Sequence, residues 1–207
     1  MKGKLITFEG TDGAGKTTQI NLLKEYLTEK GFDVVLTREP GGTTISEKIR
    51  ELLLDKNNTE MKDKTEVLLY AAARAQHVLE KIIPALNEGK IVISDRFFDS
   101  NIAYQGFGRG IGEETVFEIN KFALCGIMPD LTFFLDASPK TGLKRKINEK
   151  NHTLDRMEKE SETFHERVYE GFCTLCDKYP ERIKRIDAID DIESIHKKII
   201  QQTEKIL

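Results

Sequence analysis

The chain has 207 residues, a length that suggests one domain, with room for a small insertion, and that is sufficient to bury a core. It carries 32 Lys and Arg against 35 Asp and Glu, a net charge of −3, and this balance gives no support for a protein that binds nucleic acid or a membrane surface as a whole. The sequence has no apolar run of about 18 residues and only a short apolar run near its start, so we expect no transmembrane helix, no signal peptide and a cytoplasmic protein.

The predicted elements alternate between short apolar runs and amphipathic runs. In chain order we expect a strand over 4–8, a helix over 19–30, a strand over 33–37, a loop over 38–43 and a helix over 44–54. A polar loop over 56–64, a long helix over 65–87, a strand over 91–94, a short helix over 97–105 and a glycine-rich loop over 106–112 follow. The last elements are a helix over 113–125, a strand over 131–135, a helix from Pro139 to about 148, a polar stretch over 149–156, a helix over 159–178, a strand over 182–186 and a helix over 192–207.

Two of these helices carry more detailed expectations. In the helix over 44–54 we place Ile45, Ile49, Leu52 and Leu53 on the inward face. The long helix over 65–87 should bend near Pro84, because proline removes a helical hydrogen bond.

The alternation predicts an α/β fold with a five-stranded parallel sheet covered by helices on both faces. In such folds the ligand lies beyond the carboxyl ends of the strands. Residues that directly follow strands are therefore the first candidates for the site.

One stretch stands out at such a position. Residues 10–17 fit the pattern G-x-x-x-x-G-K-[ST], between a predicted strand and a predicted helix. Glycines let backbone N–H groups approach phosphate oxygens, and the helix directs its positive end at them. Lys16 can reach the β- and γ-phosphates and Thr17 can ligate Mg²⁺. The alternative is a plain glycine turn with a solvated lysine, but the position between a strand and a helix favours a nucleotide site. The residues of this site are Gly10, Thr11, Asp12, Gly13, Ala14, Gly15, Lys16, Thr17 and Thr18.

Charged residues follow other strands at the same edge. Asp95 follows an apolar strand and can hold Mg²⁺ opposite Thr17, although an aspartate there can also cap a helix. Arg38 and Arg96 likewise follow strands, and Arg74 lies in a helix after three alanines. Arginine forks can hold the phosphate of an acceptor bidentately, and three directed at one rim favour this role over surface salt bridges.

Two further segments have an open interpretation. Residues 149–156, flanked by the basic run 144–146, form a candidate lid that would keep water from the phosphoryl group, but an ordinary charged surface explains the pattern equally well. Cys173 and Cys176 form C-x-x-C, and since no second pair completes a zinc site we interpret them as structural thiols.

Six blocks, in order and over nearly the whole chain, resemble the bacterial thymidylate kinases: residues 9–18, 37–43, 70–74, 95–106, 129–136 and 154–156. The resemblance implies a P-loop NTPase fold of the nucleoside monophosphate kinase type, with one domain over 1–207 and a lid over about 145–157. It also implies phosphoryl transfer from ATP to dTMP, giving ADP and dTDP for dTTP synthesis, with Mg²⁺ as cofactor and usually in a homodimer.

The resemblance also assigns roles by position. It makes Lys16, Arg38, Arg96 and Asp12 catalytic, with Asp12 near the 3′-hydroxyl of the acceptor, and it makes Thr17 and Asp95 metal ligands. The acceptor residues that it implies are Asp12, Arg38, Tyr70, Arg74, Arg96, Asn101, Tyr104 and Gln105.

Among these, Tyr70 stands where the family usually has a phenylalanine stacked on thymine, and its hydroxyl then needs a partner. Asn101 and Gln105 resemble base-edge contacts, and Tyr104 resembles the residue that crowds a ribose 2′-hydroxyl.

The P-loop has no basic residue between Gly10 and Lys16, and family members of this kind place the catalytic arginine in the lid, whereas the lid here is rich in lysine. The lid candidates are Arg145, Lys146, Lys150 and Arg156, of which we assign Arg145 and Arg156 to ATP.

Two alternatives stay open on the sequence alone. One is a P-loop kinase for uridylate, deoxyguanosine or deoxycytidine, and the other is a P-loop switch protein that hydrolyses its nucleotide. The sequence does not locate a dimer interface, for which the apolar faces within 65–86 or 117–124 are candidates.

Overall fold

The computed structural model describes residues 3–142 and 154–207. Five parallel strands form one sheet in the order β2-β3-β1-β4-β5, which confirms the predicted sheet. The strands are β1 (Lys4–Glu9), β2 (Val34–Arg38), β3 (Ile91–Asp95), β4 (Leu131–Asp136) and β5 (Ile183–Asp187). Each ends one residue later than predicted, so Glu9, Arg38, Asp95, Asp136 and Asp187 are the last residues of strands.

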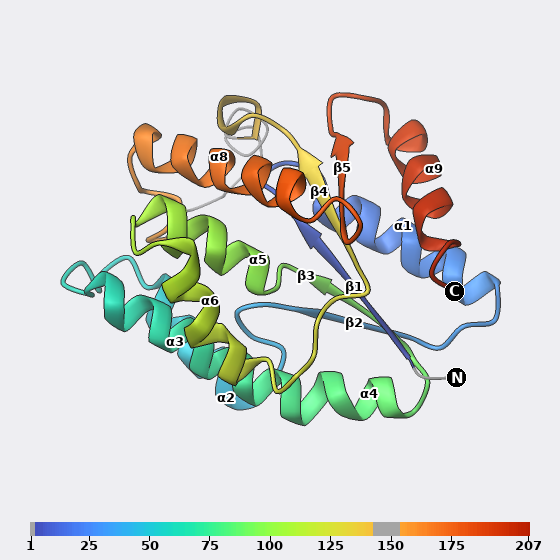
Figure 1. Cartoon of the computed structure of the whole chain (residues 1–207), viewed down its shortest axis with the longest axis horizontal. Coiled ribbons are helices and arrows are strands. Elements are labelled where there is room, and N and C mark those ends of the chain that lie inside the picture. The colour runs from blue at the N-terminus through green and yellow to red at the C-terminus, as the bar shows by residue number, and fades with distance from the viewer. Residues whose placement is uncertain (1–2, 143–153) are drawn as a thin grey trace.

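Helices cover both faces of the sheet (Figure 1). One face carries α1 (Lys16–Glu29) and α9 (Ile192–Thr203). The other elements are α2 (Thr44–Leu54), α3 (Asp63–His77), the π-helix η1 (Val78–Ile82), α4 (Ile83–Asn87), α5 (Phe98–Asn101), the π-helix η2 (Ile102–Gly108), α6 (Glu113–Ala123) and α8 (Glu162–Lys178). None of the helices within the described residues is long and apolar enough to span a membrane.

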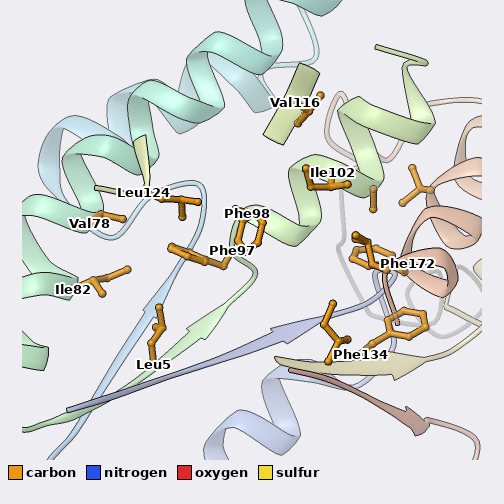
Figure 2. Close-up of a cluster of buried hydrophobic side chains, with 14 of the residues drawn as sticks. Leu5, Val78, Ile82, Phe97, Phe98, Ile102, Val116, Leu124, Phe134 and Phe172 are labelled. Atoms are coloured by element: carbon orange, nitrogen blue, oxygen red, sulfur yellow. The ribbon is translucent and has the colours of Figure 1, made fainter. Parts of the chain in front are cut away.

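Alternate residues of the strands point to opposite faces of the sheet and belong to two separate hydrophobic cores. Ile6, Phe8 and Phe133 point toward α1 and α9. On the opposite face, Leu5 and Phe134 meet the helices, where Phe97, Phe98 and Phe172 fill the space between them and the sheet (Figure 2). This alternation along doubly covered strands explains why they read as continuous apolar runs.

The expected inward face of α2 is partly wrong. Ile45 and Leu52 are about half exposed, whereas Ser46 and Leu53 are buried. The helix turns this way because Ser46 donates a hydrogen bond to the carbonyl of Ala73 (2.8 Å), which holds α2 on α3 through a small polar side chain.

Several helical boundaries differ from the expectation: α1 begins at Lys16 instead of residue 19 and α9 ends at Thr203 instead of residue 207. Three further differences have a structural reason. The bend expected near Pro84 is replaced by the π-helix η1, which lies one turn before the proline. The wider π-helical turn accommodates a proline, which has no backbone N–H to donate. Residues 106–108 continue a helix as part of η2, and Gly108 lets it approach α8, because a Cβ there would lie 2.7 Å from Phe164. Helix α8 begins at Glu162 because Ser161 caps it.

The register brings the polar strand ends together. Phe8 of β1 is level with Asp95 of β3, and Asp95 is level with Arg38 of β2. The loop after β1 therefore begins in the middle of the sheet, between the ends of β3 and β4, with the end of β2 one strand further away. This edge is the topological switch point, where the strand order reverses.

Candidate active site

The loop after β1 has the conformation that the glycine pattern predicted. Gly10, Gly13 and Gly15 have φ values of 137°, 76° and 95°, which side chains rarely adopt. At Gly10 a Cβ would also lie 2.6 Å from the carbonyl oxygen of Leu135. Helix α1 begins directly after the loop, at Lys16, with Gly15 as its N-cap. Its first N–H groups face the loop and can bind an anion.

Lys16 is folded over this loop. Its ammonium group donates hydrogen bonds to the carbonyl oxygens of Gly10 (3.2 Å) and Thr11 (3.1 Å). Burial, followed by the charge of Arg96, lowers the pKa of Lys16 to about 8. Phosphate oxygens in the loop would offer stronger acceptors and would favour the charged form of the lysine.

One carboxylate oxygen near the loop has no donor. Oδ1 of Asp95 is buried and has no hydrogen-bond partner among the residues at 3–142 and 154–207. Asp95 does not cap the next helix, whose N-cap is Phe97. Thr17, in the first turn of α1, lines the same cavity. A carboxylate with one buried, unpartnered oxygen and a hydroxyl that line the same cavity are oxygen donors that fit a hard divalent cation.

Two cavities meet at the strand ends. The P-loop cavity is lined by residues 12–19, Arg38, Asp95, Asp190 and Ile192. The tyrosine cavity is lined by Tyr70, Arg74, Asn101, Tyr104 and Gln105. Four residues line both: Asp12, Glu39, Arg50 and Arg96. The structure thus joins a phosphate-binding loop to a second polar pocket through a small set of charged side chains.

Arg96 stands at this junction. It donates to Oδ1 of Asp12 (2.9 Å) and to Oγ of Ser100 (3.1 Å), and its guanidinium lies over the ring of Tyr104. Its backbone is left-handed, with φ of 65°, which is uncommon for a residue with a side chain. Glu9 supports this turn, since its carboxylate accepts from the N–H of Phe97 (2.8 Å) and the hydroxyl of Ser100 (2.5 Å).

Arg38 and Arg74 are in different environments. Arg38 is half exposed and pairs with Glu47 at 2.8 Å. Arg74 is buried, and its Nε donates a hydrogen bond to Oε2 of Glu39 (2.7 Å), while a terminal nitrogen lies 2.5 Å from the same oxygen as an ion pair. It also bonds the amide oxygens of Asn101 and Asn120. Arg74 is therefore built into a network at the wall of the tyrosine cavity.

The polar wall continues along η2. The amide nitrogen of Asn101 donates to Gln105 (2.9 Å), and that of Gln105 donates to the buried Glu66 (2.8 Å). Tyr70 lines the same cavity, and burial raises the pKa of its hydroxyl. The structure brings together all of the side chains that were predicted for the acceptor, with Arg38 at the rim of the P-loop cavity.

The candidate lid is described only in part. Arg145, Lys146 and Lys150 lie outside the described residues. Arg156 is nearly buried; it pairs with Glu66 at 2.6 Å and donates to the carbonyl of Leu53 at 2.8 Å. This position is on the side of the tyrosine cavity, so the geometry favours an anchoring role for Arg156.

Sequence reasoning missed Glu39, Glu66 and His77, which hold the polar wall, and Arg50, which donates to the carbonyl of Pro40 at 2.8 Å. A signal was present on α3. Glu66, Tyr70, Arg74 and His77 follow one another at helical spacing, so they share one face of the helix. A row of polar side chains along one face of a helix that packs in the core indicates that this face lines a polar binding site.

The cysteine pair does not form part of the site. Cys173 and Cys176 lie on α8, and burial raises the pKa of Cys176 to about 12. Within the described ranges, no cluster of three His, Cys, Asp or Glu side chains could hold a metal ion. The structural interpretation of these thiols stays a prediction.

A parallel sheet with a phosphate-binding loop at its switch point, and a second polar pocket that shares Asp12 and Arg96 with it, is the architecture of a P-loop kinase. The sequence model described as thymidylate kinase matches residues 8–199, and the chain belongs to the thymidylate kinase family.

Individual relatives agree over the whole length. The chain is 51% identical over 195 residues to the thymidylate kinase of Geobacillus sp. (strain WCH70), covering 94% of this chain and 93% of that one. It is 49% identical over 207 residues to that of Thermoanaerobacter sp. (strain X514), covering 100% of both. The crystal structure of thymidylate kinase from Ehrlichia chaffeensis superimposes with a TM-score of 0.79 at 37% identity, covering 99% of each chain. Membership of this family excludes the switch-protein alternative. It also selects thymidylate kinase over kinases for uridylate, deoxyguanosine or deoxycytidine.

Proposed function

We propose that the P-loop cavity binds ATP and the tyrosine cavity binds dTMP, so that a phosphate oxygen of dTMP attacks the γ-phosphorus. The bond between the γ-phosphorus and the β–γ bridging oxygen breaks, and ADP and dTDP leave. The observation that carries this proposal is the position of Asp12 and Arg96, which line both cavities and are paired at 2.9 Å. Family membership supports the choice of acceptor.

On the donor side, residues 10–18 surround the phosphates and Lys16 turns from the loop carbonyls to the β- and γ-phosphates. Thr17 and Asp95 would hold Mg²⁺, which neutralises phosphate charge when bound. Arg96 stabilises negative charge between the γ-phosphate of ATP and the phosphate of dTMP. Its guanidinium is already directed to the junction of the two cavities by Asp12 and Ser100. Arg38 would join it by releasing Glu47, since their ion pair is exposed.

On the acceptor side, Tyr70 offers a ring to the base while Asn101 and Gln105 offer amide groups to its edge. Tyr104 has little freedom to move, because its ring lies beneath Arg96 and against Phe164 and Phe172. A fixed ring beside the sugar would exclude a 2′-hydroxyl.

The exposed apolar side chains support a homodimer. Ile45 and Leu52 of α2, Leu68 of α3, Leu79 of η1 and Phe122 of α6 are between half and nine-tenths exposed. Helices α2, α3 and α6 lie side by side on one side of the molecule (Figure 1). A group of exposed apolar residues on neighbouring helices is typical of a subunit interface.

We also propose that residues 1–207 act as one domain in the cytoplasm, with a lid over about 145–157.

A coupled ADP-release assay tests the proposal. The assay uses Mg²⁺ and ATP with dTMP, dUMP, UMP, CMP, dGMP or thymidine as acceptor, and we expect a strong preference for dTMP. Preference for another nucleotide would contradict the assignment of Tyr70, Asn101 and Gln105 to the thymine base. It would leave the proposed phosphoryl transfer from ATP in place. The variant Tyr104→Ala should turn over the ribonucleotide form of TMP more readily relative to dTMP, and an unchanged ratio would remove the role of Tyr104.

A further inference from the structure

The last residue of α3, His77, is fully buried and contacts two parts of the chain that lead to the site. Its Nδ1 lies 2.9 Å from Oε1 of Glu39, and its Nε2 lies 2.6 Å from the hydroxyl of Thr37. Because a carboxylate oxygen accepts hydrogen bonds and cannot donate them, Nδ1 carries the hydrogen. His77 thus donates to Glu39 and is oriented by Thr37, a residue of β2.

The carboxylate of Glu39 is divided between two partners. Oε1 accepts from His77, while Oε2 accepts from Nε of Arg74 at 2.7 Å and lies 2.5 Å from a terminal nitrogen of the same guanidinium. The Glu39 side chain is only 3% exposed, so water cannot replace a lost partner without opening the core. The orientation of the carboxylate toward Arg74 therefore depends on the hydrogen bond to its other oxygen.

His77 also packs against the loop that follows β2. A Cβ on Gly42 would lie 2.7 Å from the imidazole ring, so the ring is in close contact with the backbone there. One side chain of α3 therefore fixes both the backbone of the 39–43 loop and the carboxylate within it. From Glu39 the contacts continue through Arg74 to Asn101, on the wall of the tyrosine cavity.

We propose that His77 is a positioning residue for the acceptor: through Glu39 it holds Arg74 and Asn101 in the geometry that binds dTMP. The inference rests on the proposed assignment of the tyrosine cavity to dTMP. Glu39 lines both cavities, but its carboxylate is bonded to Arg74, on the wall of the tyrosine cavity, and within the described residues the hydrogen bonds of His77 do not include the P-loop or Lys16. We therefore expect His77 to affect the acceptor more than ATP.

Two amide variants separate positioning from packing. In His77→Asn, an amide nitrogen replaces Nδ1 near its place and can still donate to Glu39. In His77→Gln, the amide reaches toward Thr37 and leaves Oε1 of Glu39 without its donor. If His77 only fills space, the smaller asparagine should do more harm than glutamine. If it positions Glu39, the order is reversed.

Steady-state kinetics and thermal unfolding of both variants test this. We expect His77→Gln to raise the KM for dTMP about 10-fold or more, with the KM for ATP and kcat nearly unchanged, and His77→Asn to stay near the wild type. Equal KM values for dTMP in the two variants, or a parallel rise of the ATP and dTMP constants, would overturn the inference.

Two other variants keep the test decisive. If neither His77 variant folds, Glu39→Gln takes their place, and a wild-type KM for dTMP in that variant would overturn the inference. Tyr70→Ala tests the cavity alone, because Tyr70 is not among the residues that link His77 to Asn101. A normal KM for dTMP in Tyr70→Ala would remove the acceptor assignment itself, whereas a raised KM there with normal values in His77→Gln would remove only the role of His77.

Discussion

The guanidinium of Arg96 lies over the aromatic ring of Tyr104, 5.3 Å from the ring centroid. Phe164 and Phe172 hold that ring by edge contacts at 6.1 and 6.2 Å between centroids. The same guanidinium donates to Asp12 and Ser100 from two different nitrogens. The arginine is therefore held by a cation–π contact and by two hydrogen bonds before either substrate arrives, and this preorganisation is what electrostatic catalysis requires.

Replacement of Arg96 by lysine should cost activity even though the charge is kept. A lysine cannot stack on Tyr104 and donate to Asp12 and Ser100 at once, because its ammonium is a point charge on a flexible chain. We expect kcat/KM for dTMP to fall by about 100-fold. Arg185→Lys, which changes an exposed arginine paired with Asp136, serves as the control and should have nearly wild-type kinetics. A loss of less than about 3-fold in Arg96→Lys would contradict the role at the junction.

Nucleotide binding should be accompanied by proton uptake at alkaline pH. The pKa of Lys16 in the free protein is lowered to about 8, so much of it is neutral at pH 8.5, and phosphate oxygens favour its charged form. Calorimetric titration with ATP in buffers of different ionisation enthalpy should show uptake of about three-quarters of a proton by Lys16 at pH 8.5 and little at pH 6.5. Lys16→Arg stays charged and should show no uptake at either pH. Equal uptake in both proteins would place the titrating group elsewhere.

Local sequence patterns were sufficient for the sheet and for the phosphate-binding loop. The glycines at 10, 13 and 15 and the lysine that follows them are close in sequence, and the chemistry of the loop depends only on their spacing. Asp95 could be found for a similar reason, because the end of a buried strand fixes its place. These features need no knowledge of distant partners.

The network around Arg74 could not be predicted in the same way. Its partners Glu39, Asn101 and Asn120 lie 27 to 46 residues away in sequence, and only the folded chain shows that they satisfy the guanidinium. The inward face of α2 was mispredicted because apolar residues occupy more than one side of that helix. Periodicity cannot distinguish a core face from a face that awaits a second subunit.

The exposed apolar helices should control the oligomeric state. Phe122 is 89% exposed, so Phe122→Glu removes no packing within the chain but places a charge in the proposed interface. We expect the variant to sediment as a monomer at concentrations where the wild type is a dimer. Ile189→Glu, at a residue that is 74% exposed and outside helices α2, α3 and α6, should not change sedimentation. A dimeric Phe122→Glu protein would exclude this residue from the interface.

Glu66 should be important for stability because it is the common partner of two arginines. The side chain is 1% exposed and is bonded by Arg109 at 2.9 Å and by Arg156 at 2.6 Å. Glu66→Gln removes the carboxylate that pairs with the largely buried Arg156, and it leaves Arg109 to Glu160 (2.7 Å) and Asp63 (3.6 Å). We expect the free energy of unfolding to fall by about 3 kcal/mol in urea denaturation. The control Glu162→Gln breaks an exposed pair with Lys140 and should cost less than about 1 kcal/mol. Similar losses in both variants would show that the Glu66 cluster adds little.

Glu9 should make the stability of the protein depend on pH. Burial, and then the charge of Asp99, raises the pKa of Glu9 from 4.5 to about 8. Between these two values the native state binds more protons than the unfolded state, so the free energy of unfolding decreases as pH rises. The contribution of Glu9 is fully present below pH 4.5 and is lost as pH rises through about 8. At its steepest the change is about 1.4 kcal/mol per pH unit.

Glu9→Gln removes the titration while keeping the size of the side chain, and its amide can still accept from the N–H of Phe97. All other ionisable groups are common to both proteins, so the difference in unfolding free energy between wild type and variant isolates Glu9. Urea denaturation at pH 5.5, 6.5 and 7.5 should show the wild type losing stability relative to the variant at each step. Parallel curves would mean that Glu9 is ionised in the native protein throughout this range, with Arg96 supplying enough positive charge to offset its burial.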